Sequence, residues 1–397
     1  MDGYAIHSEA AKNASPQTPV MFKVLDTIKA GDDPIEILRD MRRDCTVSDS
    51  TSENQCLEIM TGPIFPEGYD ACVKIEDTMP YDGPGEKYVV LTKPVPCNAN
   101  RRLAWSDILK DDVVIQQGAV VQPSHVLALA SVGVDLMAVT RRPIVGIWST
   151  GKEIANGKGA TCDANGPYLT AATKDLGLRA EFLGILDDDP NASREVIQNT
   201  ADSVDFDILI TSGAVSKGKF DHLRDVLEQM GADIVFHGLG IRPGNPVLFG
   251  MLPRVRGRTA FFGSPGNSGA AAACFRFFVV PYIRALLGQP TERPTPARLV
   301  RNPTTTRLKH GCHPMQDMDC FRHCVVPTSQ TDQLIVEPSP DQCPAKLGPF
   351  TTANCWIHLL PDRSDKAAGP TSADMVECYP LSATGSIHLS NTAALLN

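Results

Sequence analysis

The sequence TSGAVSKGKFD (residues 211–221) is the first of three glycine-bearing turns that decide the fold of this chain. The other two turns are IRPGNP (241–246) and GSPGNSGAA (263–271). A short β-branched or aromatic run precedes each turn, as is typical of a strand that is buried on both faces. These runs occupy residues 208–210, 234–236 and 260–262.

Helical patterns follow the first and third turns, at residues 221–230 and 268–287. A strand, a turn of small residues and a helix N-terminus together offer backbone N–H groups and the positive end of a dipole to an anion. We therefore predict a phosphate- or oxyanion-binding crevice at the carboxyl edge of a parallel sheet.

Composition limits what can surround this crevice. With 397 residues, of which 42% are hydrophobic and 21% charged, the chain has an ordinary globular composition, and its length suggests about two to four domains. The net charge of −9 and the pI near 5.5 argue against an extended nucleic-acid surface. An anionic ligand must then be held by local groups.

The sequence also indicates the cellular compartment of the protein. We expect no membrane span, because no uninterrupted apolar run reaches the roughly 20 residues needed, and no signal peptide, because Asp2, Glu9 and Lys12 replace a basic segment followed by an apolar one. The 12 cysteines are scattered singly. We interpret them as reduced thiols in a cytoplasmic protein.

The order of patterns along the chain predicts several domains. Residues 142–288 alternate between strand and helix patterns, which gives a doubly wound parallel sheet. Short alternating runs between Pro/Gly turns predict β-rich domains at 20–97 and 295–397. Residues 40–55 are polar and read as a loop, and we group 1–19 with 98–141 as a further small part.

Acidic residues accompany the turns of the α/β domain, at Glu153, Asp163, Asp188 and Asp221. Carboxylates beside a phosphate crevice are what a Mg²⁺–phosphate site needs, because this ion takes oxygen ligands and bridges to phosphate. The alternative is that each one caps a helix or is a solvated turn residue, which is the commoner role of such a residue.

A set of ordered motifs in the chain resembles a known family. They are MDGYA, TGPIFPEGYDACVKIEDT, LASVG, RRPIVGIWSTGKE, DAN, ILDDDP, ITSGAVSKGKFD, RPGNP and SPGNSGAA. In this order they resemble the molybdopterin molybdenumtransferases, which include bacterial MoeA proteins and the E domain of gephyrin. The chain begins within the first motif, so we expect the segment that normally precedes it, with part of the dimer contact, to be missing.

The resemblance implies both a fold and an activity. It implies an inserted β-rich domain, a central molybdopterin-binding-like α/β domain and a C-terminal β-barrel, in a subunit that forms a homodimer. It also implies a cytoplasmic enzyme that inserts molybdate into adenylylated molybdopterin and releases AMP with Mg²⁺ or another divalent ion. No nucleic acid is implied as a partner.

The resemblance implies site residues as well. The catalytic carboxylates of the family match Asp2, Asp107, Glu153, Asp188 and Asp221, and those expected to hold the metal match Glu153, Asp188 and Asp221. The turn amides, with Arg242 or Lys217, would receive the oxyanion. The substrate-binding positions match Thr61, Asp163, Ser212, Gly213, Ser216, Gly218, Arg242, Pro243, Gly244, Pro265, Gly266 and Asn267.

Several motif positions depart from the family. Trp105 and Ala214 stand where the family usually has glycine, and Ser264 and Ser268 stand where it usually has leucine and proline. We expect Trp105 either to fill space meant for the ligand or to force its loop outward. These departures keep open a second hypothesis, that the chain is a tailoring enzyme of a specialised pathway or a non-catalytic scaffold.

Two other groupings have alternative interpretations. Zinc or copper could bind the late cysteines and histidines, although their spacings fit no standard finger and Cys320 and Cys324 would share a strand face that His323 does not. Ser212 or Ser216 could be a nucleophile, but a serine that donates to phosphate fits these turns better. The late cysteines and histidines are His310, Cys312, His313, Cys320, His323 and Cys324.

Overall fold

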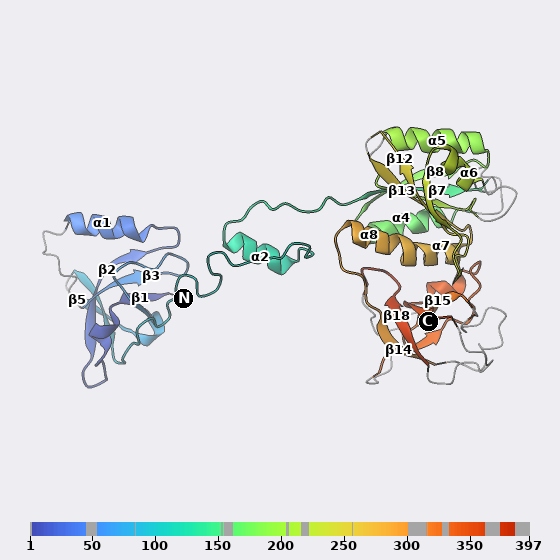
Figure 1. Ribbon diagram of the computed structural model, residues 1–397. Helices are drawn as coiled ribbons and strands as arrows, with labels where there is room; N and C mark the ends of the chain where they lie inside the picture. Colours follow the sequence, from blue (N-terminus) through green and yellow to red (C-terminus); the bar gives the residue numbers. More distant parts are fainter. Residues whose placement is uncertain are drawn as a thin grey trace. The chain divides into compact units, whose positions relative to one another are not determined.

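The computed structural model contains two compact units, residues 1–115 and 116–397, each of which is described by itself (Figure 1). Within them the structure describes residues 2–44, 54–83, 85–151, 154, 162–203, 206–215, 222–255, 257–300, 315, 317–327, 333–361 and 374–385.

The first unit is built on a six-stranded sheet with the order β4-β1-β3-β2-β6-β5. Strand β1 (Gly3–Ile6) pairs with both β3 and β4 and lies inside this β-rich sheet, and residues 98–115 belong to the same compact unit. A four-residue strand has too little pattern of its own to reveal this placement. The other strands are β2 (Val20–Ile28), β3 (Gln55–Ile59), β4 (Ala71–Lys74), β5 (Met79–Gly83) and β6 (Glu86–Leu91).

Three short helices complete this unit: α1 (Pro34–Asp44), η1 (Ser8–Ala11) and η2 (Ile75–Asp77). The prediction of a loop at 40–55 was wrong for its first residues, because helix α1 continues to Asp44. Ile37, Leu38 and Met41 pack from α1 against the sheet core. Their i, i+1, i+4 spacing is the apolar face of a helix, but the charged residues between them dominate the composition.

The second unit contains a central six-stranded sheet with the order β10-β12-β13-β9-β7-β8. Four strands are parallel, as predicted: β7 (Ile144–Thr150), β8 (Arg179–Leu186), β9 (Ile208–Ser212) and β13 (Arg258–Ser264). Helices α5 (Pro190–Ser203) and α6 (Leu223–Gln229) lie on one side of this sheet, and α4 (Asn165–Asp175), α7 (Ser268–Cys274) and α8 (Val280–Leu286) lie on the other (Figure 1). The doubly wound α/β domain is thus confirmed.

One strand of this sheet differs from its prediction. Strand β10 (Asp233–His237), expected as a buried parallel strand, is an antiparallel edge strand beside β12 (Leu248–Pro253). Two of its five residues are exposed, Asp233 and Val235. A short β-branched run does not reveal whether its strand is central or at an edge.

Helices α7 and α8 form one continuous helical run with the π-helical segment η3 (Phe275–Val279) between them. Among the described residues this run, Ser268–Leu286, is long and apolar enough to cross a membrane, which the sequence analysis did not expect. Some 56% of it is buried inside the protein. Phe275, Val279 and Ile283 pack into the core of the sheet, so it is built as a core helix.

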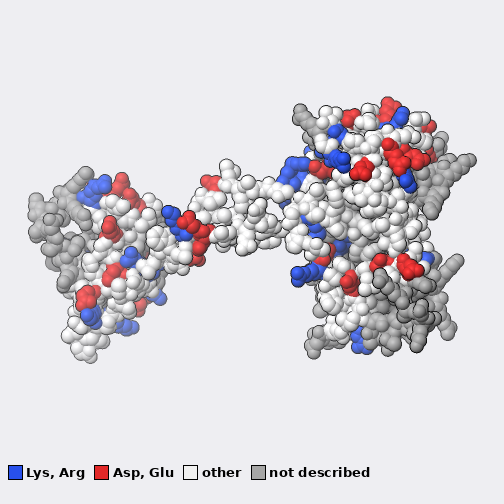
Figure 2. Space-filling view, in the orientation of Figure 1, with Lys and Arg blue, Asp and Glu red and all other residues white. Residues whose placement is uncertain are grey.

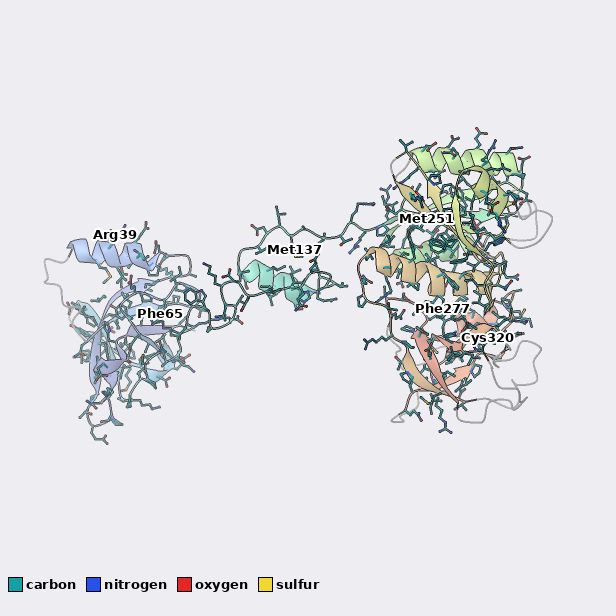
Figure 3. The ribbon with its side chains drawn as sticks, viewed as in Figure 1. Arg39, Phe65, Met137, Met251, Phe277 and Cys320 are labelled. Atoms are coloured by element: carbon teal, nitrogen blue, oxygen red, sulfur yellow. The ribbon has the colours of Figure 1, made fainter. Side chains whose placement is uncertain are left out.

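The C-terminal part forms a closed five-stranded barrel, as predicted, with each strand paired in the ring β15-β16-β14-β18-β17-β15. Phe277, labelled in Figure 3, stacks on Phe321 of β15 at 4.0 Å between ring centroids and joins the helical run to the barrel. The barrel strands are β14 (Thr295–Leu299), β15 (Asp319–Val325), β16 (Ile335–Pro338), β17 (Cys355–Leu359) and β18 (Asp374–Pro380), and a short helix α9 (Gly348–Thr351) precedes β17.

Candidate functional site

A cavity of about 650 Å³ lies where the three predicted turns meet. All three turns contribute to its wall, and the C-terminal part adds Met318 and Pro344. The predicted site residues that line it are Gly213, Arg242, Pro243, Gly244, Pro265, Gly266 and Asn267. The convergence of the turns is therefore a feature of the structure, while the roles of these residues stay predictions.

The first turn needs a left-handed backbone. Gly213 has a φ of 102°, and a Cβ there would collide with the hydroxyl of Thr150. Ala214, at the family's usual glycine, has a φ of 57° and so keeps the glycine-like conformation at a cost of about 1–2 kcal/mol. The Gly213 N–H donates to the Ser264 carbonyl over 2.8 Å, which fixes this turn to the third one.

The second turn is held by the barrel. Strand β11 (Ile241–Arg242) pairs in parallel with β15, and the Arg242–Pro243 peptide bond is cis. Gly244 has a φ of 109°, and a Cβ there would lie 2.7 Å from the sulfur of Cys274. The chain thus needs glycine at this point, as the motif predicted.

A buried guanidinium supports this turn from behind. Arg322 is 4% exposed and donates from one terminal nitrogen to the carbonyls of Arg242 and Phe321, each over 3.0 Å. Its Nε has no partner in the part of the chain that the structure describes. Arg322 was not predicted as a site residue, because a lone arginine in a β-like segment carries no motif.

The third turn corrects the expectation of an open helix N-terminus. The N–H of Gly269, in the first turn of α7, donates to the Pro344 carbonyl over 2.8 Å, and those of Ala270 and Ala271 donate to the Asn267 carbonyl. These donors are already satisfied within the protein and do not face a ligand. The first two turns and Arg242, rather than these three α7 N–H groups, are left to receive an anion.

A second, smaller cavity of about 140 Å³ adjoins the first, and Gly266 lines both. Three of its lining residues, Asp163, Ser212 and Gly266, were predicted as substrate-binding. Asn165 was missed, although it belongs to the quoted motif DAN. Its side chain crosses from α4 to the first and third turns, donating to Ser212 Oγ and to the Gly266 carbonyl over 2.7 Å each.

The predicted metal ligands are not assembled among the described residues. Asp188 is half-buried after β8 and lines neither cavity. No group of three His, Cys, Asp or Glu residues in the described part of the chain could hold a metal ion. Glu153 and Asp221, like the predicted substrate residues Ser216 and Gly218 and the cation Lys217, lie outside the described residues.

The other predicted carboxylates belong to the first unit. Asp2 accepts hydrogen bonds from the N–H and the hydroxyl of Thr61, at 2.7 and 2.9 Å, and these bonds hold its pKa below the ordinary value. Asp107 forms an ion pair with Arg102 in the same loop. Trp105 has a φ of 64° and is 69% exposed, so the loop turns its indole outward, one of the two expected outcomes.

The late cysteines and histidines do not form a site within the described residues. Cys320 and Cys324 are buried in the barrel core, whereas His323 lies on the opposite face of β15, against Phe350 and Trp356. This separation agrees with the expected strand alternation. His310, Cys312 and His313 lie outside the described residues.

Two families match the chain in sequence. Residues 1–133 match the "MoeA N-terminal region (domain I and II)". Residues 146–285 match the "Probable molybdopterin binding domain". This range contains the six strands of the central sheet, apart from the first two residues of β7, and all three glycine turns.

The similar curated proteins are named molybdopterin molybdenumtransferases. The Staphylococcus aureus (MSSA476) protein is 30% identical over 293 residues, which are 72% of this chain but 64% of that protein. The Bacillus subtilis protein is 31% identical over 72% of this chain and 63% of its own length. This chain therefore spans somewhat under two thirds of these relatives. The Synechococcus elongatus protein is 26% identical over 94% of this chain and 86% of its own length.

Solved structures of MoeA proteins have a similar fold. A crystal structure of the molybdopterin biosynthesis MoeA protein from Pyrococcus horikoshii aligns with a TM-score of 0.71 at 23% identity, covering 96% of this chain and 86% of that one. A second structure of a MoeA protein from this organism aligns with a TM-score of 0.64 at 20% identity, over 95% of this chain. With both domain families in order along the sequence and the matching fold beneath them, the chain belongs to the MoeA family.

Proposed function

We propose that the protein is a molybdenum insertase, which transfers molybdenum from molybdate to adenylylated molybdopterin and releases AMP in molybdenum cofactor biosynthesis. The larger cavity carries this proposal: three turns converge on a space of about 650 Å³, which suits a nucleotide-sized ligand. The names of the curated relatives supply the chemical class.

The charge of the cavity fits an anionic substrate. Arg242 lines its wall, and the buried Arg322 holds the Arg242 carbonyl. A guanidinium is always protonated, and its planar set of donors matches phosphate oxygens. Together with the backbone N–H groups of the first two turns, Arg242 would bind the phosphate at which AMP leaves and stabilise the charge that develops there, while Arg322 holds the Arg242 turn in place.

The proposed reaction also uses a divalent ion. Glu153, Asp188 and Asp221 would hold Mg²⁺, which would neutralise the phosphate being cleaved. Asp163 is the one carboxylate among the described residues that lines either cavity, and alone it does not make a magnesium site. The chemistry assigned above to Arg242 and the turn amides does not pass through the metal.

We propose a cytoplasmic homodimer as the working form, and the segment around α2 (Pro123–Ser131) supports the association. None of the residues of α2 is buried, and Figure 2 shows this segment almost free of charged side chains. Contiguous exposed apolar surface is typical of a protein interface. The exposed apolar side chains of this segment are Val120, Val121, Val126, Leu127, Val132, Val134, Leu136, Met137 and Val139.

A single-turnover assay tests the activity. Purified protein is mixed with adenylylated molybdopterin, molybdate and Mg²⁺, and AMP is measured by mass spectrometry. We expect AMP from the wild type, at least about tenfold less from Arg242→Gln, and wild-type release from Arg258→Gln, which changes an exposed arginine paired with Asp233. A wild type that dimerises but releases no AMP would favour the scaffold hypothesis instead.

A further inference from the structure

The first glycine turn contains a residue whose backbone is strained. Ala214 has a φ of 57°, in the left-handed region that a residue with a Cβ adopts only at a cost. Gly213, Ala214 and Val215 all line the larger cavity, so the strain lies in its wall. A strained residue keeps its conformation only where the surrounding structure holds it. The contacts on the two sides of Ala214 therefore decide the shape of this wall.

The side that precedes Ala214 is held by the third turn. The Gly213 N–H donates to the Ser264 carbonyl over 2.8 Å. This bond continues the pairing of β9 with β13, whose last residues, Ser212 and Ser264, are register partners. The backbone before Ala214 is thus anchored to the central sheet.

The side that follows Ala214 is held by a histidine from the edge of the sheet. His237, the last residue of β10, lies with Nε2 2.7 Å from the carbonyl oxygen of Val215. A carbonyl oxygen only accepts hydrogen bonds, so Nε2 carries the hydrogen and donates it. His237 is half-buried and does not line the cavity. It therefore acts on the turn and not directly on a ligand.

The surrounding chain fixes the position of this imidazole. His237 pairs with Leu248 of β12, and Leu248 and Val215 belong to the same buried cluster. Directly after His237 the chain enters the loop that contains the second turn, and there the Gly238 N–H donates to the Val247 carbonyl over 2.9 Å. The histidine thus joins the base of this loop to the end of the first turn.

We propose that His237 is a positioning residue for the anion site: its hydrogen bond to Val215 holds Ala214 in the left-handed conformation that shapes the cavity wall. The inference deepens the proposed function and rests on it for the choice of AMP as the ligand. It also explains how this chain keeps a glycine-like turn with alanine at the position where the family usually has glycine.

The affinity for AMP tests the inference on the full chain. His237→Phe keeps a flat ring but has no donor, so the end of the turn is released. We expect AMP to bind at least about tenfold more weakly to this variant by calorimetry. His237→Gln retains an N–H donor and should stay within about threefold of the wild type. Equal affinities of the wild type and His237→Phe would overturn the inference.

A substitution at Ala214 separates a positioning role from a merely structural one. Ala214→Gly removes the strain, because glycine adopts a positive φ without a steric penalty. The turn then depends less on the histidine, so in this background His237→Phe should weaken AMP binding by less than about threefold. An equal loss in both backgrounds would show that His237 supports the fold as a whole, and would refute its action through Ala214.

Hydrogen exchange of residues 213–215, followed by mass spectrometry, tests the same contact without a ligand. Exchange should be at least about tenfold faster in His237→Phe than in the wild type. This measurement separates the inference from the proposed function. If the wild type binds no AMP, the proposed function loses its anion site, while faster exchange still supports the role of His237 and unchanged exchange refutes it.

The wild-type protein decides the matter if His237→Phe does not fold. Nitrogen NMR of the imidazole at alkaline pH, where the ring is neutral, shows which nitrogen carries the hydrogen. A hydrogen on Nε2 that is protected from exchange with water would support the contact with Val215. A hydrogen on Nδ1, or one that exchanges as fast as in free imidazole, would overturn it.

Discussion

The backbone N–H of Gly269 donates to the carbonyl of Pro344 over 2.8 Å, and this bond joins the first turn of α7 to the loop after β16. A Cβ at Gly269 would lie 3.0 Å from both the Cα and the carbonyl oxygen of Pro344. The approach is so close that only glycine fits without movement. The barrel loop is thereby held as one wall of the larger cavity.

Gly269→Ala should therefore destabilise the protein by about 1–3 kcal/mol, because the added methyl group pushes against backbone that cannot move freely. Denaturant unfolding measures the change. The matched control is Gly348→Ala, where nothing lies within 4 Å of the added Cβ and the change should stay within about 0.5 kcal/mol. Equal effects of the two substitutions would show that the contact with Pro344 is not tight.

Arg322 should matter for ligand binding more than for stability. Arg322→Met removes a buried cation that has no carboxylate partner among the described residues. The loss of its hydrogen bonds lowers the free energy of unfolding, but the removal of a buried charge raises it, so the two effects partly cancel. The Arg242 turn loses its support, and we expect AMP to bind about tenfold more weakly by calorimetry. Arg224→Gln, on an exposed ion pair of α6, serves as the control. Unchanged affinity for AMP in Arg322→Met would show that Arg322 does not contribute to ligand binding.

His323 should make the barrel sensitive to acid. Burial, with Arg322 adding to it and Asp341 opposing it, lowers the pKa of His323 to about 4. The unfolded chain has the ordinary value near 6.5, so between these values the unfolded state binds more protons and stability rises with pH. The stabilisation is complete above about pH 6.5 and is lost as pH falls toward 4, by up to about 3 kcal/mol.

Unfolding measured across this pH range checks the prediction against His323→Phe. The ring of His323 packs edge-on to Phe350 and Trp356, so phenylalanine fits the same apolar surroundings. The variant should lose most of the slope between about pH 4 and 6.5. An unchanged slope would assign the acid sensitivity to other groups.

The pKa of Asp2 should respond to Thr61. The hydroxyl and the N–H of Thr61 lower this pKa from 3.8. Thr61→Val removes the hydroxyl but keeps the N–H, so the pKa should rise toward its ordinary value. Because the folded pKa is lowered, the contact stabilises the protein fully above the unfolded pKa and is lost as pH falls through the folded one. Carbon NMR of the Asp2 carboxyl follows the titration; no shift would refute the contact.

Much of the fold could be predicted from local patterns. The parallel strands β7, β8, β9 and β13 are short apolar runs, and β7 and β9 end directly before a glycine. The convergence of the three turns followed from their order along a doubly wound sheet. Edge strand β10 was mistaken for a central one because apolar character alone does not give the order of strands.

The parts of the site that long-range packing supplies could not be predicted. Pro344 lines the larger cavity and Arg322 supports the Arg242 turn behind it, both from a domain whose pairing of β15 with β11 joins segments about eighty residues apart. That same packing satisfied the Gly269 N–H of α7, which local pattern suggested was free. Asn165 was present in a quoted motif, but its role depends on contacts with Ser212 and Gly266, which no spacing reveals.

A crystal structure of the protein soaked with AMP tests the central claim, that the first two turns and Arg242 form an anion site in the larger cavity. We predict the phosphate in the larger cavity, with its oxygens within hydrogen-bond reach of Arg242 and of the Gly213 turn. Phosphate density bound away from all three turns, at a ligand concentration that fills the crystal, would contradict the claim.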